Sequence, residues 1–596
     1  MSLQFITGNS GNGKTKYLFN RIVKEAKANP RDNYLVIVPE QFTMQTQRQL
    51  VDLSENKAIM NIDVLSFKRL AYRVFDELGI TNLTVLEETG KNLVLRKLAA
   101  QEADKLGVIG RNLNRIGYIS EVKSLLSELV QYNISPEELG RYIASGRLSD
   151  TLSDKLKDVL VLYEAFEKFM QDKYITAEEI LNVLSNVAEE SAILRNSVIA
   201  FDEFTGFTPI QNQLIKKLFV ISKKIYVTLT IDCREDIFKS RGMQELFDMP
   251  KRTVKSLTEM AAFYGIEVEE PIILDKNYRL AENEELSFME QQLFRKRRGS
   301  FKKAPKHIHI DCLRDPKQEL TKIARRINEL VRNENLRYRD IAIVTGDVNI
   351  YAGYVREIFD KYNIPYFIDA TQEILFHPFI EFIRSIPDIA AQNFSADAVF
   401  RFLRCGFSEL LDSEIDVLEN YVLACGVRGK SAWDKKWVRL PKHKAGYDIE
   451  LLNQSREYIM ELLKPVYQVF SDKKSTVKDY VLAIYKLIVL LDIPDKLAKK
   501  EQALLDAGDQ TASKEYGQIY KIVMQLFEKY VAVLGDECMD AEEFTQILDA
   551  GLDAADVAVI PPGYDTVTIG DIERTRLTNI KVMFYPGVND GIVPKA

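Results

Sequence analysis

The sequence predicts an α/β protein in which two parallel-sheet domains are each interrupted by a long helical insertion. Short apolar runs bounded by turn residues alternate with helical patterns near the N-terminus and again after residue 300. Continuous apolar runs of this kind are typical of parallel strands that helices cover on both faces. Between them lie two long stretches with only three- and four-residue apolar spacing, which indicates helices. A chain of 596 residues has room for about four domains.

The first domain is expected to open with a strand, a glycine-rich turn, a helix and a second strand. Such a β-turn-α-β unit joins parallel strands through a right-handed crossover. Strand-like runs return after a helical stretch, so we assign residues 1–110 and 190–290 to this domain and residues 111–189 to its helical insertion. The expected strands are 3–7, 34–38, 197–201 and 224–229, and the first helix is 14–27.

The second domain is expected to repeat this plan after the basic segment at residues 295–303. We assign residues 300–375 and 556–596 to it, and residues 376–555 to a second helical insertion. Its expected strands are 308–311, 341–344, 366–368, 566–569 and 582–585, with helices near 316–333 and 350–363.

The composition is that of an ordinary globular protein. Apolar residues make up 46% of the chain and charged residues 28%, which excludes a disordered or small disulfide-stapled protein. The net charge is −7, so a nucleic-acid partner would have to meet local basic surface. The five cysteines are scattered and form no Cys-x-x-Cys pair, and neither a secretory signal nor a membrane span is visible. We therefore expect a cytoplasmic protein without membrane association.

A phosphate-binding loop follows the first strand and precedes the first helix. Its glycines let backbone N–H groups turn toward a phosphate, the helix N-terminus adds partial positive charge, and the lysine reaches the β- and γ-phosphates. A glycine-rich turn that only joins strand to helix is the alternative, but the full motif in this position favours ATP binding. The predicted nucleotide-binding residues here are Gly8, Asn9, Ser10, Gly11, Asn12, Gly13, Lys14 and Thr15.

Two adjacent carboxylates end the predicted strand at 197–201. Asp202 is expected to orient Mg²⁺ together with the hydroxyl of Thr15, and Glu203 to polarise an attacking water as the catalytic residue. An acidic strand end that opens a loop is common by itself. A phosphate-binding loop upstream makes the functional interpretation the better one.

These motifs, with others along the chain, resemble those of superfamily 1 helicases. The combination is most similar to the AddB-type subunits of the bacterial AddAB-type ATP-dependent helicase/exonuclease family. The similar segments are the phosphate loop, Pro39–Gln41, residues 64–70, Asp202–Glu203 with Gln211, Asn277–Arg279, residues 341–365, residues 582–594 and, within these, Pro586–Gly591.

The resemblance covers essentially the whole chain and carries several expectations. It implies two RecA-like domains with helical subdomains, adds Arg279 to the nucleotide site, and implies single- and double-stranded DNA and the AddA-type helicase/nuclease chain as partners. It also implies a longer protein, whose C-terminal nuclease region would carry an iron–sulfur cluster on four cysteines. No such cysteine group occurs in this sequence, so the cluster is expected only in the region that is missing.

Several positions depart from the helicase pattern. The acids are followed by Phe204 and Thr205 instead of a glutamine, and Glu235 stands where the family has the glutamine that links the γ-phosphate to DNA. The adenine-reading glutamine has no room before the first strand, and the last motif, with its arginine finger, is absent. In the helicase motif V, the family has threonine, histidine, lysine, glycine and glutamate. The corresponding positions here hold Asp571, Glu573, Arg576, Leu577 and Asn579. The departures predict a chain that binds ATP–Mg²⁺ but is not a motor.

Candidate DNA contacts come from one matched motif and one basic segment. Ser66 and Lys68 fall where the family contacts single-stranded DNA. Residues 295–306 hold seven Lys/Arg around Phe301, and Arg297, Arg298 and Lys302 are the candidates there. A solvated linker explains that segment about equally well. Trp433 and Trp437 lie four apart among lysines; this spacing favours core packing over base stacking.

We interpret the chain as the DNA-binding, ATP-binding subunit of a helicase/exonuclease that processes double-strand breaks for recombinational repair. With degenerate motifs it would act as a scaffold that recognises DNA sequence rather than as a motor. One alternative is an independently active superfamily 1 helicase or translocase. Another is a P-loop binding module whose nucleotide site is only structural.

Overall fold

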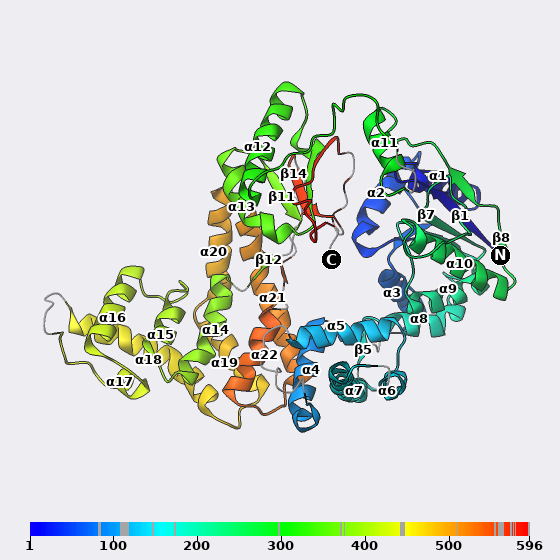
Figure 1. Cartoon of the computed structure of the whole chain (residues 1–596). Coiled ribbons are helices and arrows are strands. Elements are labelled where there is room, and N and C mark those ends of the chain that lie inside the picture. The colour runs from blue at the N-terminus through cyan, green and yellow to red at the C-terminus, as the bar shows by residue number, and fades with distance from the viewer. Residues whose placement is uncertain are drawn as a thin grey trace. The chain divides into compact units, whose positions relative to one another are not determined.

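The computed structural model describes residues 1–593 with gaps, and its chain divides into two compact units (Figure 1). Unit 1 comprises Met1–Leu86 and Ser124–Cys312, and unit 2 comprises Glu87–Lys123 and Leu313–Ala596. The residues outside the description are 81–84, 87, 108–117, 146–147, 172–173, 296–298, 370–371, 375, 442–446, 508, 554–555, 558–564, 573–574, 576, 578–579 and 594–596.

Unit 1 is built on a parallel sheet, as the apolar runs predict. Among the described residues its strand order is β3-β2-β6-β7-β1-β8, and β9 also pairs with β1. Every pairing in this sheet is parallel. The strands are β1 (Ser2–Gly8), β2 (Tyr34–Ile37), β3 (Ile62–Leu65), β6 (Val198–Phe201), β7 (Lys224–Thr230), β8 (Glu267–Val268) and β9 (Ile272–Leu274).

Helices cover both faces of this sheet, because alternate residues of each strand point to opposite sides. Leu3 and Phe5 of β1 pack in one core with residues of α3, α8, α9 and α10. Ile6 of the same strand packs in a second core with residues of α1 and α2. These helices and α11 are α1 (Lys14–Ala28), α2 (Thr43–Leu53), α3 (Phe67–Leu78), α8 (Ile180–Val187), α9 (Pro209–Ile221), α10 (Asp248–Phe263) and α11 (Glu284–Gln292).

A helical segment lies between β3 and β6 along the chain. It contains a short parallel pair, β4 (Val85–Leu86) with β5 (Ile175–Thr176). Its helices include α5 (Tyr118–Gln131), α6 (Pro136–Ala144) and α7 (Asp150–Met170), and α6 packs on α7.

Unit 2 contains a second parallel sheet, with the order β11-β14-β10-β15. The pairings are parallel, and helices α12 and α13 pack on β10 and β14 through a shared apolar core. The chain is therefore an α/β protein with two parallel sheets and many helices. The elements are α12 (Pro316–Asn333), β10 (Ile341–Thr345), α13 (Val348–Lys361), β11 (Tyr366–Asp369), β14 (Val567–Asp571) and β15 (Val582–Phe584).

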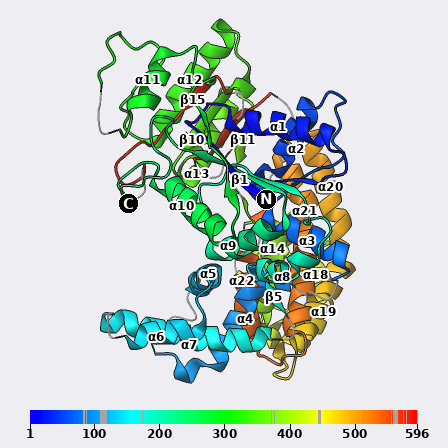
Figure 2. The same ribbon diagram turned by 90° about the vertical axis from the view of Figure 1, so that its right-hand side faces the viewer.

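A large helical body forms the rest of unit 2 (Figure 2). A short antiparallel pair, β12 (Gln372–Glu373) with β13 (Asp556–Val557), joins its two ends. Its helices are α14 (Pro378–Ala391), α15 (Ala396–Leu403), α16 (Asp412–Cys425), α17 (Lys430–Asp434), α18 (Ile449–Ser471), α19 (Val477–Leu490), α20 (Ile493–Asp506), α21 (Gln510–Leu534) and α22 (Ala541–Asp553).

The compact units place two segments differently from the expected boundaries. Helix α4 (Glu88–Gln101) packs on α21 and α22 in unit 2, where Leu93 is buried and Arg96 donates a hydrogen bond of 2.9 Å to the carbonyl oxygen of Gln546. Residues 300–312 cluster with unit 1, because the carboxylate of Glu285 on α11 accepts hydrogen bonds from the backbone N–H groups of Lys306 and His307.

One predicted strand is wrong. Residues 308–311 form no regular structure, and Ile310 is 94% exposed. Alternating apolar residues make a strand only where a neighbouring strand accepts their backbone hydrogen bonds. No strand of the described sheets pairs with residues 308–311.

Candidate functional site

The phosphate loop lies at the carboxyl edge of the unit 1 sheet, between Gly8 at the end of β1 and Lys14 at the start of α1. Gly11 and Gly13 have φ angles of 87° and 78°, a left-handed backbone that other residues rarely adopt. Ligands of open α/β sheets bind outside this edge. The loop therefore lies between a strand and a helix, as the sequence predicts.

The segment Asn277–Arg279 lies across the loop. The backbone N–H groups of Tyr278 and Arg279 donate to the carbonyl oxygen of Gly11 at 3.0 and 3.3 Å. The side-chain amide of Asn277 donates to the carbonyl oxygen of Ser10 at 3.0 Å, and Arg279 Nη1 lies 3.4 Å from the Ser10 hydroxyl. The structure thus brings Arg279 to the site where the resemblance puts it.

Tyr278 belongs to the matched segment Asn277–Arg279, although the resemblance assigns only Arg279 to the nucleotide site. A Cβ built on Gly13 would lie 3.4 Å from Tyr278 Cδ2, so the ring borders the start of α1. The side chain is 65% exposed, and the ammonium of Lys276 lies 5.0 Å from the centroid of its ring.

Lys14 is held inside the loop that precedes it. Its Nζ donates to the carbonyl oxygens of Gly8 and Asn9 at 3.1 and 3.0 Å. Burial lowers the pKa of Lys14, while the negative charges of Glu203 and Asp202 act in the opposite direction. The loop therefore holds a desolvated cation that a phosphate group can pair with strongly.

Thr15 joins the loop to the acidic end of β6. Its hydroxyl donates to Asp202 Oδ1 at 3.3 Å and to Glu203 Oε1 at 3.4 Å, and the Thr228 hydroxyl also donates to Asp202 Oδ1. A hydroxyl and a buried carboxylate side by side form the oxygen donor set that Mg²⁺ takes in nucleotide sites. The residues present therefore fit the metal that the motif implies.

Glu203 adopts a φ of 66°, which is uncommon for a residue with a side chain. Strained backbone of this kind is concentrated at functional sites, where the surrounding structure holds it in place. The carboxylate of Glu203 lies 3.4 Å from the hydroxyl of Thr15.

Glu235, which stands in the place of the family's glutamine, lies beside a cation. Its carboxylate lies 2.7 Å from the Nζ of Lys251 on α10, and Glu245 pairs with the same ammonium at 3.3 Å. Lys251 is 4% exposed, so this cation is enclosed by the two acids. The carboxylate at position 235 is thus paired with a cation that it shares with Glu245.

The DNA candidates have different surroundings. Ser66 is buried; its hydroxyl caps α3 by accepting from the backbone N–H of Arg69 at 3.2 Å and donates to Glu40. Lys68 and Lys302 are exposed, and Arg297 and Arg298 lie outside the described residues. Lys68 and Lys302 are therefore the accessible cations of this set, and their contact with DNA stays a prediction.

The two tryptophans belong to the core of unit 2, as their spacing favours. Trp433 and Trp437 are 0% and 6% exposed, with ring centroids 5.2 Å apart. The side chain of Asn453 bonds the backbone N–H and carbonyl oxygen of Trp437. Buried rings held in this way cannot stack on bases.

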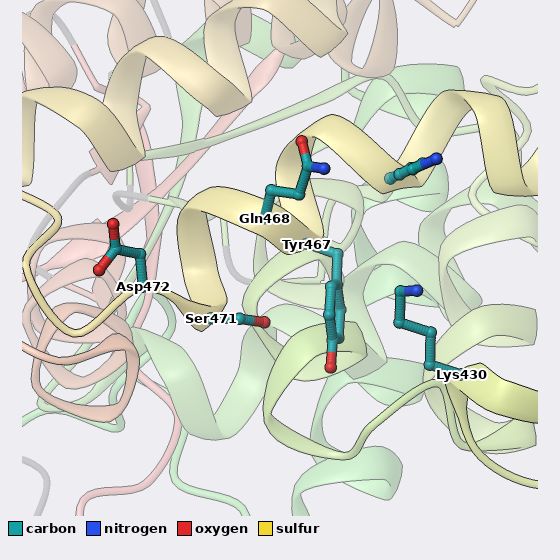
Figure 3. A pocket seen from close by; sticks show the side chains of 6 residues that line it. Lys430, Tyr467, Gln468, Ser471 and Asp472 are labelled. Carbon is teal, nitrogen blue, oxygen red and sulfur yellow. The ribbon is translucent and has the colours of Figure 1, made fainter.

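Unit 2 contains a pocket that is separate from the phosphate loop, and Figure 3 shows the side chains that line it. Its volume is about 330 Å³. The ammonium of Lys430 is paired with Asp434 at 2.6 Å and lies 5.4 Å from the ring centroid of Tyr467. The lining residues are Lys430, Lys464, Tyr467, Gln468, Ser471 and Asp472.

The N-terminal part of the chain matches a known protein family. Residues 5–290 match the family described as ADDB, N-terminal. They include the phosphate loop, both acids at the end of β6, and Arg279.

Similarity to curated proteins extends over the whole chain. Proteins named as the B subunit of an ATP-dependent helicase/deoxyribonuclease are 39% identical in Lachnoclostridium phytofermentans, 33% in Caldanaerobacter subterraneus and 32% in Clostridium acetobutylicum. Each match covers 100% of this chain and 52–53% of the relative, so the chain spans about half the length of the proteins it resembles. Among the described residues, no helix has the length and apolar character needed to cross a bilayer.

Proposed function

We propose that this chain binds ATP–Mg²⁺ and DNA as part of the AddB-type chain of a helicase/nuclease complex that acts in double-strand break repair. The contact of Thr15 with Asp202 beside the buried ammonium of Lys14 carries the nucleotide part. Arg279, on the segment that covers the loop, adds a second cation. The names of the relatives support the complex and its action on DNA.

Within this proposal the two units are RecA-like domains of the superfamily 1 type with helical insertions, and the partner in a heterodimer is the AddA-type helicase/nuclease chain. When bound, Mg²⁺ would supply charge neutralisation for the phosphates, with Thr15 and Asp202 as its protein-side oxygen donors. Lys14 and the loop N–H groups would orient the β- and γ-phosphates. Glu203 would hold a water for attack.

ATP hydrolysis is expected to be slow and not stimulated by single-stranded DNA. Glu235 occupies the place of a coupling glutamine, and its carboxylate is tied to Lys251, so this position offers no amide to a γ-phosphate. Phosphate release with and without single-stranded DNA measures this, with Glu203→Gln as background. A large DNA-stimulated rate that disappears in Glu203→Gln would favour an independent motor.

Single-stranded DNA binding should weaken steeply with salt. If about four phosphates are neutralised, raising salt from 50 to 200 mM lowers the affinity about fiftyfold, because each contact releases a condensed counterion. Lys68→Ala and Lys302→Ala should each reduce the slope of log affinity against log salt by about 0.7.

Lys24→Ala is the matched control for the DNA measurement, since Lys24 is an exposed lysine on α1 outside the candidate set. Fluorescence anisotropy of a labelled oligonucleotide gives the affinities of the wild type and the three variants at each salt concentration. An affinity that does not change with salt would instead indicate a protein-binding scaffold.

A further inference from the structure

Asn9 connects the phosphate loop to two other parts of unit 1. Its side-chain Nδ2 donates to Oε1 of Glu290 on α11 at 2.8 Å, and its Oδ1 accepts from the backbone N–H of Cys233, after β7, at 2.9 Å. The side chain is buried. A side-chain amide supplies both the donor for the carboxylate and the acceptor for the N–H group. Both polar functions of Asn9 are thus used by protein neighbours.

Glu290 belongs to a charge cluster at the end of α11. Its carboxylate lies 3.9 Å from the guanidinium of Arg295, whose Nε donates to Asp232 Oδ2 at 2.9 Å. Burial raises the pKa of Asp232, but hydrogen bonds from Arg234 and the charge of Arg295 outweigh it and set that pKa at about 2. The guanidinium of Arg295 also lies 4.8 Å from the ring centroid of Phe247.

Arg295 is the first residue of the basic segment 295–306. The sequence places it among candidate DNA contacts, whereas the structure uses its charge to fasten the end of α11 to the loop after β7. A contact chain therefore runs from Asn9 in the phosphate loop through Glu290 to the residue where the basic segment begins.

We propose that Asn9 and Glu290 form a relay in which nucleotide binding loosens α11 and the start of the basic segment. The inference rests on the proposed nucleotide site. Glu290 is one of the carboxylates whose negative charge acts on Lys14. A triphosphate bound at Lys14 carries the same sign, so nucleotide and docked Glu290 oppose each other electrostatically. Asn9 and Glu290 are positioning residues in this relay.

The opposition has a reciprocal consequence. If bound nucleotide weakens the contact of Glu290 with Asn9, the intact contact must weaken nucleotide binding by the same free energy. Removing the charge of Glu290 while keeping an acceptor for Asn9 should therefore tighten nucleotide binding. Couplings between sites are typically about 5- to 150-fold, and we expect about fivefold because Glu290 contacts the loop but not the phosphates.

The test compares the full chain with Glu290→Gln, whose side-chain oxygen can still accept from Asn9. Calorimetric titration with ATP–Mg²⁺ should give about fivefold tighter binding in the variant. Hydrogen exchange should slow in the loop and α1 of the wild type on adding ATP–Mg²⁺, and quicken in α11. In Glu290→Gln the quickening of α11 should disappear. Glu282→Gln removes an exposed carboxylate just before α11 and should behave as wild type.

A second variant distinguishes the relay from a purely structural role. Asn9→Asp keeps the acceptor for Cys233 but sets a carboxylate against Glu290, so α11 should exchange fast with or without nucleotide. Equal ATP affinity in wild type and Glu290→Gln, with α11 unaffected by nucleotide, would overturn the relay and leave the nucleotide site standing. Absence of ATP binding to the wild type would overturn both.

Discussion

Replacing Lys14 with alanine should lower the affinity for ATP–Mg²⁺ at least a hundredfold. Its ammonium is desolvated, and it donates hydrogen bonds to the carbonyl oxygens of Gly8 and Asn9. These bonds hold the ammonium inside the loop, where the phosphates are proposed to bind. Each hydrogen bond between charged partners contributes about 1.5–3 kcal/mol. Two such bonds to phosphate oxygens amount to about 3–6 kcal/mol, or roughly a hundredfold to more than ten-thousandfold in affinity.

Lys16→Ala is the matched control, because Lys16 is exposed two residues further along the same helix. Titration calorimetry on wild type and both variants separates a specific phosphate contact from general loss of positive charge. Thermal unfolding of the same samples without nucleotide shows whether either variant is misfolded. Equal affinity in wild type and Lys14→Ala would remove the phosphate site from this loop.

The arrangement of the proposed nucleotide site could be predicted because its residues are close in sequence or follow a recognisable strand. The loop, Lys14 and Thr15 are contiguous, and Asp202 ends an apolar run that any parallel sheet would bury. Turn chemistry and helix position are local properties, so a motif of eight residues carries them.

What could not be predicted depends on contacts between distant residues. Nothing in the sequence around Glu235 shows that Lys251, on the next helix, neutralises it. The end of α4 is likewise bound by Glu537, which pairs with Lys97 at 2.6 Å. The strand expected at residues 308–311 was wrong for the same reason, because strand pairing depends on residues that are distant in the sequence.

Removing the cation that pairs with Glu235 should strongly destabilise unit 1. In Lys251→Met the apolar volume is largely kept, but the carboxylates of Glu235 and Glu245 lose their shared partner in a mostly buried setting. Breaking a buried ion pair from one side costs about 3–5 kcal/mol, and we expect about 3 because Glu235 is partly exposed. Lys255→Met, on the exposed face of α10, should change stability by less than about 0.5 kcal/mol.

The pH dependence has a definite sign. Burial raises the pKa of Glu245, but hydrogen bonds from the backbone of Arg241 and from Lys251 lower it further than burial raises it. A carboxylate with a depressed folded-state pKa stabilises the protein above its unfolded pKa, and that stability is lost as the pH falls through the folded value. The difference between wild type and Lys251→Met should therefore be largest near neutral pH and shrink in acid.

The chain offers a way to assign this loss to one unit. Both of its tryptophans, Trp433 and Trp437, lie in the core of unit 2, so their fluorescence reports on that unit, whereas far-ultraviolet circular dichroism reports on both. In urea, the unit 1 part of the dichroism transition should move about 1 M lower in Lys251→Met, while the fluorescence transition stays in place. An unshifted dichroism transition would show that the Lys251 pair contributes little. A joint shift of both signals would show that the two units unfold as one.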